Sequence, residues 1–307
     1  MRDDFSNALL CGIIPPVATP LAGPDELDVP GLERLIEHIL LGGAHGLFIL
    51  GTTGEGPALS YQLRRELIHR TCRQVAGRVP VLVAVTDSAS AEMLHMADCA
   101  AESGATAIVV APPYYFPLGQ PDLLRLIEDL AGRSALPLYL YNQPELTKTS
   151  FSPETVERAS QIPKVAGIKD SSGDMRYLRQ VLERVSSRPG FSVLVGPEHL
   201  LLEALHSGAH GGVPGGANIF PELVVRLYRA YMSDDEGTAR ELQERIIAIG
   251  APIWTSREAG PAYLRRLKCA LSLLGLCSAK PAWPCVESAA DERHQIENHL
   301  REHGILG

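Results

Sequence analysis

A single lysine stands at the end of an apolar segment that has the character of a buried strand. Lys169 follows the run 165–168 and precedes a polar turn, residues 170–173. A lysine in a dry pocket is desolvated, which disfavours the ammonium and lowers its pKa toward roughly 7–8. Such an amine can attack a ketone and form a Schiff base. From position alone, the alternatives are an ion pair with Asp170 or a side chain that bends out to water.

A tyrosine ends the preceding strand-like segment in the same way. Tyr141 lies near the end of the run 136–142, within the string PLYLYNQP. Adjacent strands lie about 4.8 Å apart, so this phenol and the Lys169 amine are expected to approach each other. A phenol in this place can relay protons to and from a reacting carbonyl. The alternative is a strand-end tyrosine that only packs against its neighbours.

The string GTTGEG, residues 51–56, follows another apolar segment. Its glycines allow a tight turn. The exposed backbone N–H groups of such a turn, including that of Gly54, suit a carboxylate, as do the hydroxyls of Thr52 and Thr53. A glycine turn flanked by threonines is also common without any ligand.

Two other groups favour structural interpretations. Tyr114 and Tyr115 lie in the proline-rich run PPYYFP, where tyrosines mostly serve packing. His299 and His303 have the four-residue spacing of a zinc pair. They lie on a polar helix near the end of the chain, and no third ligand is evident. We therefore expect a solvated helix face there and no metal site.

Short apolar segments alternate with longer amphipathic ones, and these elements must position the side chains above. The predicted strands are 12–19, 46–51, 79–85, 106–113, 136–142, 164–170, 191–196 and 211–216. The predicted helices are 29–43, 60–77, 90–103, 120–131, 152–160, 174–187, 198–208 and 220–232. Apolar strands indicate a parallel sheet with both faces covered by helices. Eight such units favour an α/β fold of the (β/α)₈ TIM barrel type, since no glycine-rich nucleotide motif supports an open sheet.

The strand pattern stops after residue 233. The sequence therefore predicts a catalytic barrel domain over 1–233 and a small C-terminal helical domain over 234–307. Active sites of such barrels are built at the carboxyl ends of the strands. Lys169, Tyr141 and the turn 51–56 all occupy such ends in the predicted topology.

Composition excludes several classes of protein. The chain has 307 residues and a formal charge of -8, whereas a nucleic-acid binder would show a basic face. Its six cysteines form no C-x-x-C pair, which is typical of free thiols in a reducing compartment. No run approaches the roughly 18 apolar residues of a membrane-spanning helix, and no signal-like segment begins the sequence. A cytoplasmic location without membrane contact is expected.

The ordered set of motifs is more specific than its parts. GTTGEG after the second strand, PPYY after the fourth, YNQP after the fifth and GIKDSSGD after the sixth together resemble the dihydrodipicolinate synthase / N-acetylneuraminate lyase family. The resemblance implies a (β/α)₈ barrel with a C-terminal helical domain, usually as a homotetramer. It also implies a class I aldolase mechanism, in which a lysine condenses with pyruvate or another 2-oxo acid. The covalent imine then serves in place of any cofactor.

The same resemblance implies a role for each matching residue. Lys169 matches the Schiff-base lysine, and Tyr141 matches the tyrosine that shuttles protons. Thr52 and Thr53 match the pair near the pyruvate carboxylate. Tyr115 matches a synthase tyrosine that a neighbouring subunit contributes to the threonine–tyrosine relay. In addition, Val213 falls where the eighth strand's backbone touches pyruvate.

Departures from the family pattern concern the second substrate. Synthases that use aspartate semialdehyde resemble Y-N-x-P-x-R-T-G, in which the arginine holds that substrate's carboxylate. Here Leu146 takes the arginine's place, and an alkyl chain cannot make a bidentate carboxylate contact. Lys148 is either a substitute cation or an exposed loop lysine. Glu198 and His199 either meet sugar hydroxyls or are surface residues at a helix start.

The sequence thus predicts a lyase or aldolase that acts on pyruvate or a 2-oxo-3-deoxy acid plus an aldehyde. The alternatives are a true 4-hydroxy-tetrahydrodipicolinate synthase and a dehydratase of the same family. A non-catalytic sensor of 2-oxo acids is a third, against which the presence of both Lys169 and Tyr141 argues.

Overall fold

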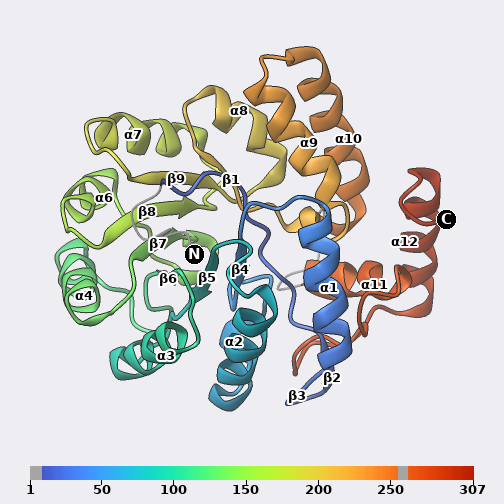
Figure 1. The fold of residues 1–307 in the computed structure, drawn as a ribbon, viewed down its shortest axis with the longest axis horizontal. Helices are drawn as coiled ribbons and strands as arrows, with labels where there is room; N and C mark the ends of the chain where they lie inside the picture. The colour runs from blue at the N-terminus through green and yellow to red at the C-terminus, as the bar shows by residue number, and fades with distance from the viewer. Residues whose placement is uncertain (1–8, 255–261) are drawn as a thin grey trace.

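A ring of parallel strands surrounded by helices forms the centre of the computed structural model, which describes residues 9–254 and 262–307 (Figure 1). The ring strands are β1 (Gly12–Ile13), β4 (Leu47–Ile49), β5 (Val81–Ala84), β6 (Ala107–Val110), β7 (Leu138–Asn142), β8 (Val165–Asp170), β9 (Ser192–Val195) and β10 (Gly211–Gly212). Their order in the sheet is β1-β10-β9-β8-β7-β6-β5-β4, and neighbours pair in parallel. The predicted (β/α)₈ barrel is confirmed.

A helix follows every ring strand and packs outside the sheet (Figure 1). These helices are α1 (Val29–Leu41), α2 (Tyr61–Val75), α3 (Ser90–Glu102), α4 (Gln120–Arg133), α6 (Pro153–Ser160), α7 (Met175–Val185), α8 (Leu201–His206) and α9 (Pro221–Met232). Local sequence explains where they begin. The Ser60 hydroxyl caps α2 by accepting from the backbone N–H of Leu63 at 3.1 Å. Ser152 caps α6 in the same way, and Pro153 takes the first helical position, where no N–H is needed.

In the described part of the chain, three 3₁₀ turns lie at the carboxyl ends of ring strands. They are η2 (Gly56–Ala58), η3 (Glu198–Leu200) and η4 (Gly215–Asn218). Each begins a few residues after its strand, so these turns belong to the loops that build the mouth of the barrel.

Apolar side chains fill both sides of the sheet. Inside the ring, the buried cluster includes Phe48, Tyr139, Tyr141, Leu194 and Val213. A larger cluster lies between the strands and the outer helices. Every residue of β7 is buried, as expected for a strand covered on both faces. Burial of one large apolar side chain contributes roughly 1.5–3 kcal/mol, so this two-sided packing is the main source of stability.

The first predicted strand, 12–19, is much shorter than expected. Pro15 and Pro16 have no N–H to donate to a ladder, so regular pairing ends at β1. The ring closes instead through an isolated bridge between Pro16 and Phe48, whose N–H donates to the carbonyl of Pro15 at 3.0 Å. The Asn218 side chain supports this seam by donating to the Pro16 carbonyl at 2.9 Å.

Two local elements were not predicted. A hairpin formed by β2 (Leu21–Gly23) and β3 (Glu26–Leu27) precedes α1, and a one-turn helix α5 (Pro144–Thr147) follows β7. Strands of two or three residues are too short to show an alternating pattern, and a single helical turn is too short to show a helical period.

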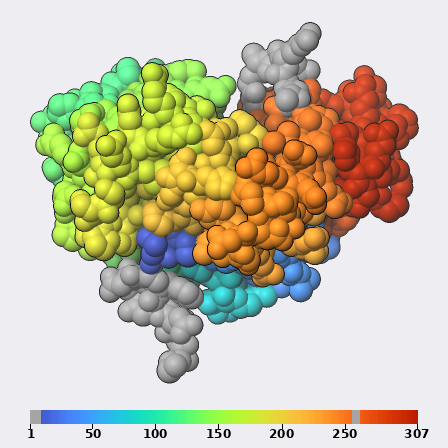
Figure 2. All heavy atoms as spheres, turned by 90° about the horizontal axis from the view of Figure 1, so that it is seen from above, coloured from blue at the N-terminus to red at the C-terminus, as the bar shows by residue number. Residues whose placement is uncertain are grey.

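Three further helices follow the barrel: α10 (Glu236–Trp254), α11 (Ala262–Leu273) and α12 (Ala290–Glu302). Figure 2 shows them, in orange and red, along one side of the molecule. The predicted domain boundary after residue 233 lies in the link between α9 and α10 and stays a prediction. Residues 1–8 of the first predicted domain and 255–261 of the second lie outside the described residues. Within the described ranges, no helix has the length and apolar character needed to cross a membrane.

Candidate active site

Lys169 is the fifth residue of β8, and its side chain enters the ring. Its Nζ lies 4.2 Å from the centroid of the Tyr141 ring and 4.9 Å from that of Phe48. Asp170 points the other way, as the next residue of a strand must, and accepts from Asn142 Nδ2 at 2.9 Å and Ser172 Oγ at 3.0 Å. Among the described residues no acidic side chain pairs with the amine, so the alternative of an ion pair with Asp170 is wrong.

Burial sets the electrostatic state of this amine. Lys169 is 7% exposed, and desolvation lowers its pKa below the ordinary lysine value, while the Tyr141 side chain acts in the opposite direction. Aromatic faces attract the ammonium but do not provide a counter-charge. The neutral, nucleophilic form is therefore favoured more than in an exposed lysine.

Tyr141 lies directly beside Lys169. The two residues are register partners in the β7–β8 pair, so the expected approach of phenol and amine is present. The Tyr141 hydroxyl is 3.0 Å from Thr52 Oγ1, and either atom can donate this hydrogen bond. An amine, a phenol and a threonine hydroxyl thus meet at the carboxyl ends of β8, β7 and β4. Such a set can transfer protons at a reacting carbonyl.

The turn 51–56 has an unusual backbone. Leu50 and Glu55 adopt the left-handed conformation, with φ of 60° and 55°. Gly56 is required, because a Cβ there would lie 2.0 Å from the carbonyl oxygen of Leu50. The result is a compact loop that returns the chain sharply after β4. Two non-glycine residues at positive φ indicate strain that surrounding contacts must hold.

The inner side of this turn offers donors to an anion. Thr53 and Gly54 are buried, yet no atom of the described chain accepts a hydrogen bond from either backbone N–H. Buried N–H groups are normally satisfied. The Gly54 carbonyl accepts from Thr19 Oγ1 at 2.7 Å, which fixes the peptide that follows it. Two free amides and a threonine hydroxyl suit a carboxylate.

Val213 follows β10 and is buried in the inner cluster together with Tyr141. Its N–H donates to the Val195 carbonyl at 2.8 Å, which holds the backbone of this loop in line with β9. The structure therefore brings together five features at the carboxyl ends of the ring strands: Lys169, Tyr141, Thr52, the turn 51–56 and Val213.

A cavity of about 390 Å³ adjoins this group. Thr52 and Tyr141 line it on one side, and Leu146 and Trp283 lie on its mostly apolar wall. Leu146 is 50% exposed and occupies the position at which the synthase pattern has an arginine. Arg64 also contributes to the lining, but its guanidinium is paired with Asp87 at 3.2 Å.

Four sequence candidates lie apart from this group. Tyr115 is 71% exposed and packs edge-on against Phe116, so it does not reach Lys169 within one chain. Lys148 is exposed and donates to the Glu145 carbonyl of its own loop. His199 is exposed, and His299 lies 3.1 Å from the backbone carbonyl oxygens of Ala248 and Ile249.

Glu198 is neither a surface residue nor a free ligand. Its carboxylate is buried and accepts from Gly216 N at 2.6 Å and from Trp254 Nε1 at 2.5 Å. Burial raises its pKa to about 7, although both hydrogen bonds favour the charged form. The side chain thus joins η3, η4 and α10 at the carboxyl ends of β9 and β10. Its carboxylate is occupied by these contacts, which do not support the expected contact with sugar hydroxyls.

Sequence reasoning missed the contribution of α11. The Tyr263 side chain interacts with that of Thr53, and Lys268 forms a buried ion pair with Glu55. One signal was available, because Lys268 occupies the apolar stripe that Leu264, Leu267 and Leu271 define. Only long-range contacts show where this stripe packs.

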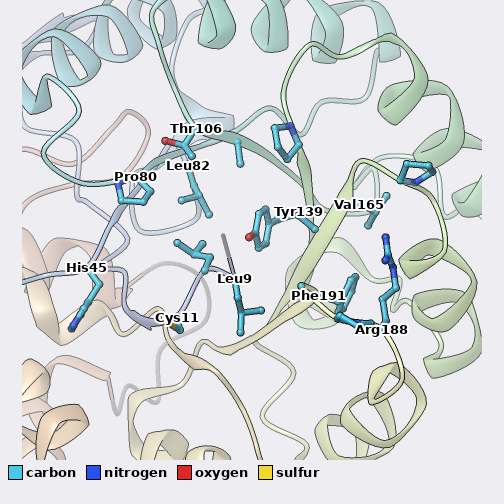
Figure 3. A pocket seen from close by; sticks show the side chains of 17 residues that line it. Leu9, Cys11, His45, Pro80, Leu82, Thr106, Tyr139, Val165, Arg188 and Phe191 are labelled. Atoms are coloured by element: carbon cyan, nitrogen blue, oxygen red, sulfur yellow. The ribbon is translucent and has the colours of Figure 1, made fainter. Parts of the chain in front are cut away.

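A second cavity, of about 430 Å³, opens at the other end of the ring (Figure 3). Its lining includes Pro80, Pro137 and Pro163, which precede β5, β7 and β8. Figure 3 shows Tyr139 and Cys11 among the side chains around it. Burial raises the pKa of Tyr139 to about 12, so it stays neutral. Since barrel chemistry is built at the carboxyl ends of strands, we place the candidate site at the opposite end.

Comparisons with known proteins cover nearly the whole chain. Residues 9–303 match the model of the dihydrodipicolinate synthetase family. A dihydrodipicolinate synthase of Bacteroides thetaiotaomicron shares the fold with a TM-score of 0.92 and 50% identity, over 95% of this chain and 98% of that one. A prophage protein of Escherichia coli K12 that belongs to the dihydrodipicolinic acid synthase family, solved in complex with pyruvate, matches with a TM-score of 0.92. It is 28% identical over 97% of this chain and 100% of its own.

Another relative carries a different activity in its name. A probable 2-dehydro-3-deoxy-D-pentonate aldolase of Escherichia coli K12 is 33% identical, over 96% of this chain and 98% of its own length. The matched proteins thus include both synthases and an aldolase. Their names do not agree on the second substrate.

Proposed function

The chain belongs to the dihydrodipicolinate synthetase family of lyases and aldolases, and from this premise we propose that Lys169 forms a Schiff base with a 2-oxo acid. The proposed substrates are pyruvate or a 2-oxo-3-deoxy acid, together with an aldehyde. One observation carries the proposal. Lys169 is buried with no acidic partner among the described residues, its pKa is lowered by desolvation, and Tyr141, which is hydrogen-bonded to Thr52, lies beside it.

The proposed cycle begins when the neutral Lys169 amine attacks the C2 carbonyl carbon. The carbonyl oxygen takes up protons and leaves as water, which produces an iminium. Loss of a proton from C3 then gives an enamine, whose electron pair forms the new bond to the aldehyde carbon. Water hydrolyses the product imine and releases Lys169. Cleavage follows the same steps in reverse, and the imine nitrogen accepts the electron pair that a cofactor would otherwise take.

Tyr141 and Thr52 are proposed to move the protons of these steps. Their hydroxyl oxygens are 3.0 Å apart, so a proton can pass along this pair. The Tyr141 ring also lies against the Lys169 amine, which supports a role for its hydroxyl at the carbinolamine oxygen. In the family's synthases a tyrosine from a neighbouring subunit extends the relay, and Tyr115 is our candidate for it.

The turn 51–56 is proposed to hold the substrate carboxylate. The unpaired N–H groups of Thr53 and Gly54 and the Thr53 hydroxyl supply the hydrogen bonds. The backbone beside Val213 would bound the other side of the bound 2-oxo acid. Held in this way, C2 of the acid faces Lys169.

Leu146 supports our choice of second substrate. It carries no charge where synthases have an arginine, and Lys148 is turned to its own loop. Arg64 in the adjoining cavity is already paired with Asp87. A second carboxylate would therefore find no free cation among these side chains, which favours an aldehyde or a 2-oxo-3-deoxy sugar acid. A true synthase activity is the second candidate, and the 50% identical relative named as a synthase favours it.

Borohydride reduction tests the mechanism. We expect the protein incubated with pyruvate and borohydride to gain the mass of one reduced pyruvate adduct, located on Lys169. Absence of the adduct, or its persistence in Lys169→Ala, would show that the mechanism is wrong. A dehydratase of the family would pass this test too, and it is recognised by water loss without aldehyde release.

Turnover measurements test the substrate. We expect faster cleavage of at least one 2-oxo-3-deoxy acid than condensation of pyruvate with aspartate semialdehyde. Efficient condensation would contradict our interpretation of Leu146 and establish the synthase activity.

We also propose a cytoplasmic homotetramer that contacts neither membranes nor nucleic acid. The exposed pair Tyr115 and Phe116, at 71% and 70%, supports an interface between subunits at the carboxyl end of β6. The free cysteines support a reducing compartment.

A further inference from the structure

We propose that α11, outside the barrel, holds the carboxylate-binding turn 51–56 in its binding shape, with Tyr263 and Lys268 as positioning residues. This inference rests on the proposed function, because it concerns how the 2-oxo acid is recognised. The two side chains are five residues apart on one helix and reach two neighbouring parts of the same turn.

The first contact is a buried ion pair between Lys268 and Glu55. Their side chains are 1% and 2% exposed. The other Glu55 oxygen accepts from Ala282 N at 2.6 Å, and Lys268 Nζ also donates to the Lys280 carbonyl at 2.8 Å. The carboxylate of the turn is thus held between α11 and the segment that follows it.

Stability alone does not account for such a pair. Removing two charges from water costs much of what their attraction gains, and well-packed apolar residues in the same place are often as stable. An ion pair does fix the position of both side chains. Glu55 lies at φ 55°, a conformation that needs support from outside the turn. We therefore assign the pair to the shape of the turn.

The second contact is between the side chains of Tyr263 and Thr53, which interact electrostatically. Burial raises the pKa of Tyr263, so its hydroxyl keeps its proton, while the Thr53 side chain acts in the opposite direction. The Tyr263 ring packs against Trp254 with centroids 5.6 Å apart, and Trp254 is in turn held by Glu198.

The turn is held both by the barrel and by α11. Thr19 holds the Gly54 carbonyl from the first strand's loop at 2.7 Å. The side chains of α11 hold Thr53 and Glu55, on either side of Gly54. The two N–H groups offered to the carboxylate therefore depend on a helix far away in the sequence.

The test measures pyruvate recognition in the full chain. The variants Tyr263→Phe and Lys268→Met are incubated with increasing pyruvate and borohydride, and the adduct on Lys169 is followed by mass. We expect the half-saturating pyruvate concentration to rise about five- to tenfold, as for loss of one buried hydrogen bond. The rate at saturation is expected to stay within twofold. Tyr231→Phe is the matched control, because the Tyr231 hydroxyl donates to the Leu205 carbonyl at 2.8 Å, away from the turn.

Acetone serves as the second probe, since it forms an imine but has no carboxylate. We expect its half-saturating concentration to be unchanged in both variants. Unchanged pyruvate saturation in a folded Tyr263→Phe would overturn the proposal, and so would an equal rise for pyruvate and acetone. Should Lys268→Met not fold, Tyr263→Phe decides. Failure of the wild-type protein to trap pyruvate would instead overturn the proposed function.

Discussion

At the scale of single residues, the site depends on one amine without a counter-charge. Lys169 lies between two aromatic rings and is buried with no acidic side chain of the described chain paired to it. Such a residue lowers stability, because burial disfavours its charged form. The proposed imine chemistry needs a free amine and would account for its presence in the ring.

Replacing this lysine tests both halves of that argument. In Lys169→Met we expect no pyruvate adduct and a higher free energy of unfolding at pH 7. The unfolded chain holds the Lys169 proton up to about pH 10.5, whereas the folded protein releases it at lower pH. Release of the Lys169 proton therefore makes the free energy of unfolding of the wild type rise with pH up to about 10.5. The variant lacks this pH-dependent contribution. Denaturant titrations at pH 7 and pH 10 measure it, and an equal or lower stability of the variant at pH 7 contradicts the prediction.

The second substrate is argued at the same scale. Leu146→Arg restores a cation at the wall of the adjoining cavity. A charge-assisted hydrogen bond contributes about 1.5–3 kcal/mol, so we expect kcat/KM for aspartate semialdehyde to rise about 10- to 100-fold. Leu146→Met is the matched control and leaves it unchanged. No gain in Leu146→Arg shows that another feature excludes this substrate.

At the scale of elements, loops and helices remote in sequence fix the mouth of the barrel. Glu198 joins η3 to η4 and α10 through two hydrogen bonds. Gly216 has to be glycine here, because a Cβ would lie 2.6 Å from the Glu198 carboxylate. The buried Glu198 carboxylate therefore holds the loop that carries Val213.

The raised pKa of Glu198 predicts a pH dependence of stability. Its pKa is about 7 in the folded protein against 4.5 for a free glutamate, so the folded state binds the proton more tightly. The free energy of unfolding should then fall as pH rises from about 4.5 to about 7, by about 3 kcal/mol at about 1.4 kcal/mol per pKa unit. Denaturant titrations across this range measure the slope. Glu198→Gln is expected to remove this component, and an identical slope in the variant contradicts the assignment.

Much of this arrangement was predictable from particular residues. Lys169 and Tyr141 end apolar runs because strands buried on both faces become polar only at the mouth, so their proximity followed from adjacent strand ends. The link between Glu55 and Ala282 was not predictable, because it joins residues 227 positions apart. Nothing local in either segment indicates the other. The cap residues Ser60 and Ser152 were predictable, because capping depends on a few neighbouring residues.

At the scale of the whole molecule, the exposed tyrosine of the loop after β6 is the residue that the proposed homotetramer would use between subunits. Tyr115 is exposed here, while the family resemblance places it in a neighbour's proton relay. We expect Tyr115→Phe to lower turnover about tenfold and to leave the mass in sedimentation unchanged. Mixed assemblies with Lys169→Met subunits are expected to recover activity, since each supplies what the other lacks. No recovery would show that Tyr115 acts within its own chain or not at all.

The seam of the ring has a consequence for the enzyme's lifetime. On one edge β4 pairs with β5 over three residues, but on the other it meets Pro16 in an isolated bridge. Proline has no amide hydrogen to bond, so thermal opening of the sheet and amide exchange should begin at this edge. An adduct bound to Lys169 on β8 and to the turn after β4 would span the ring across this opening. Substrate occupancy would then protect the protein from unfolding and proteolysis as well as engage it in catalysis.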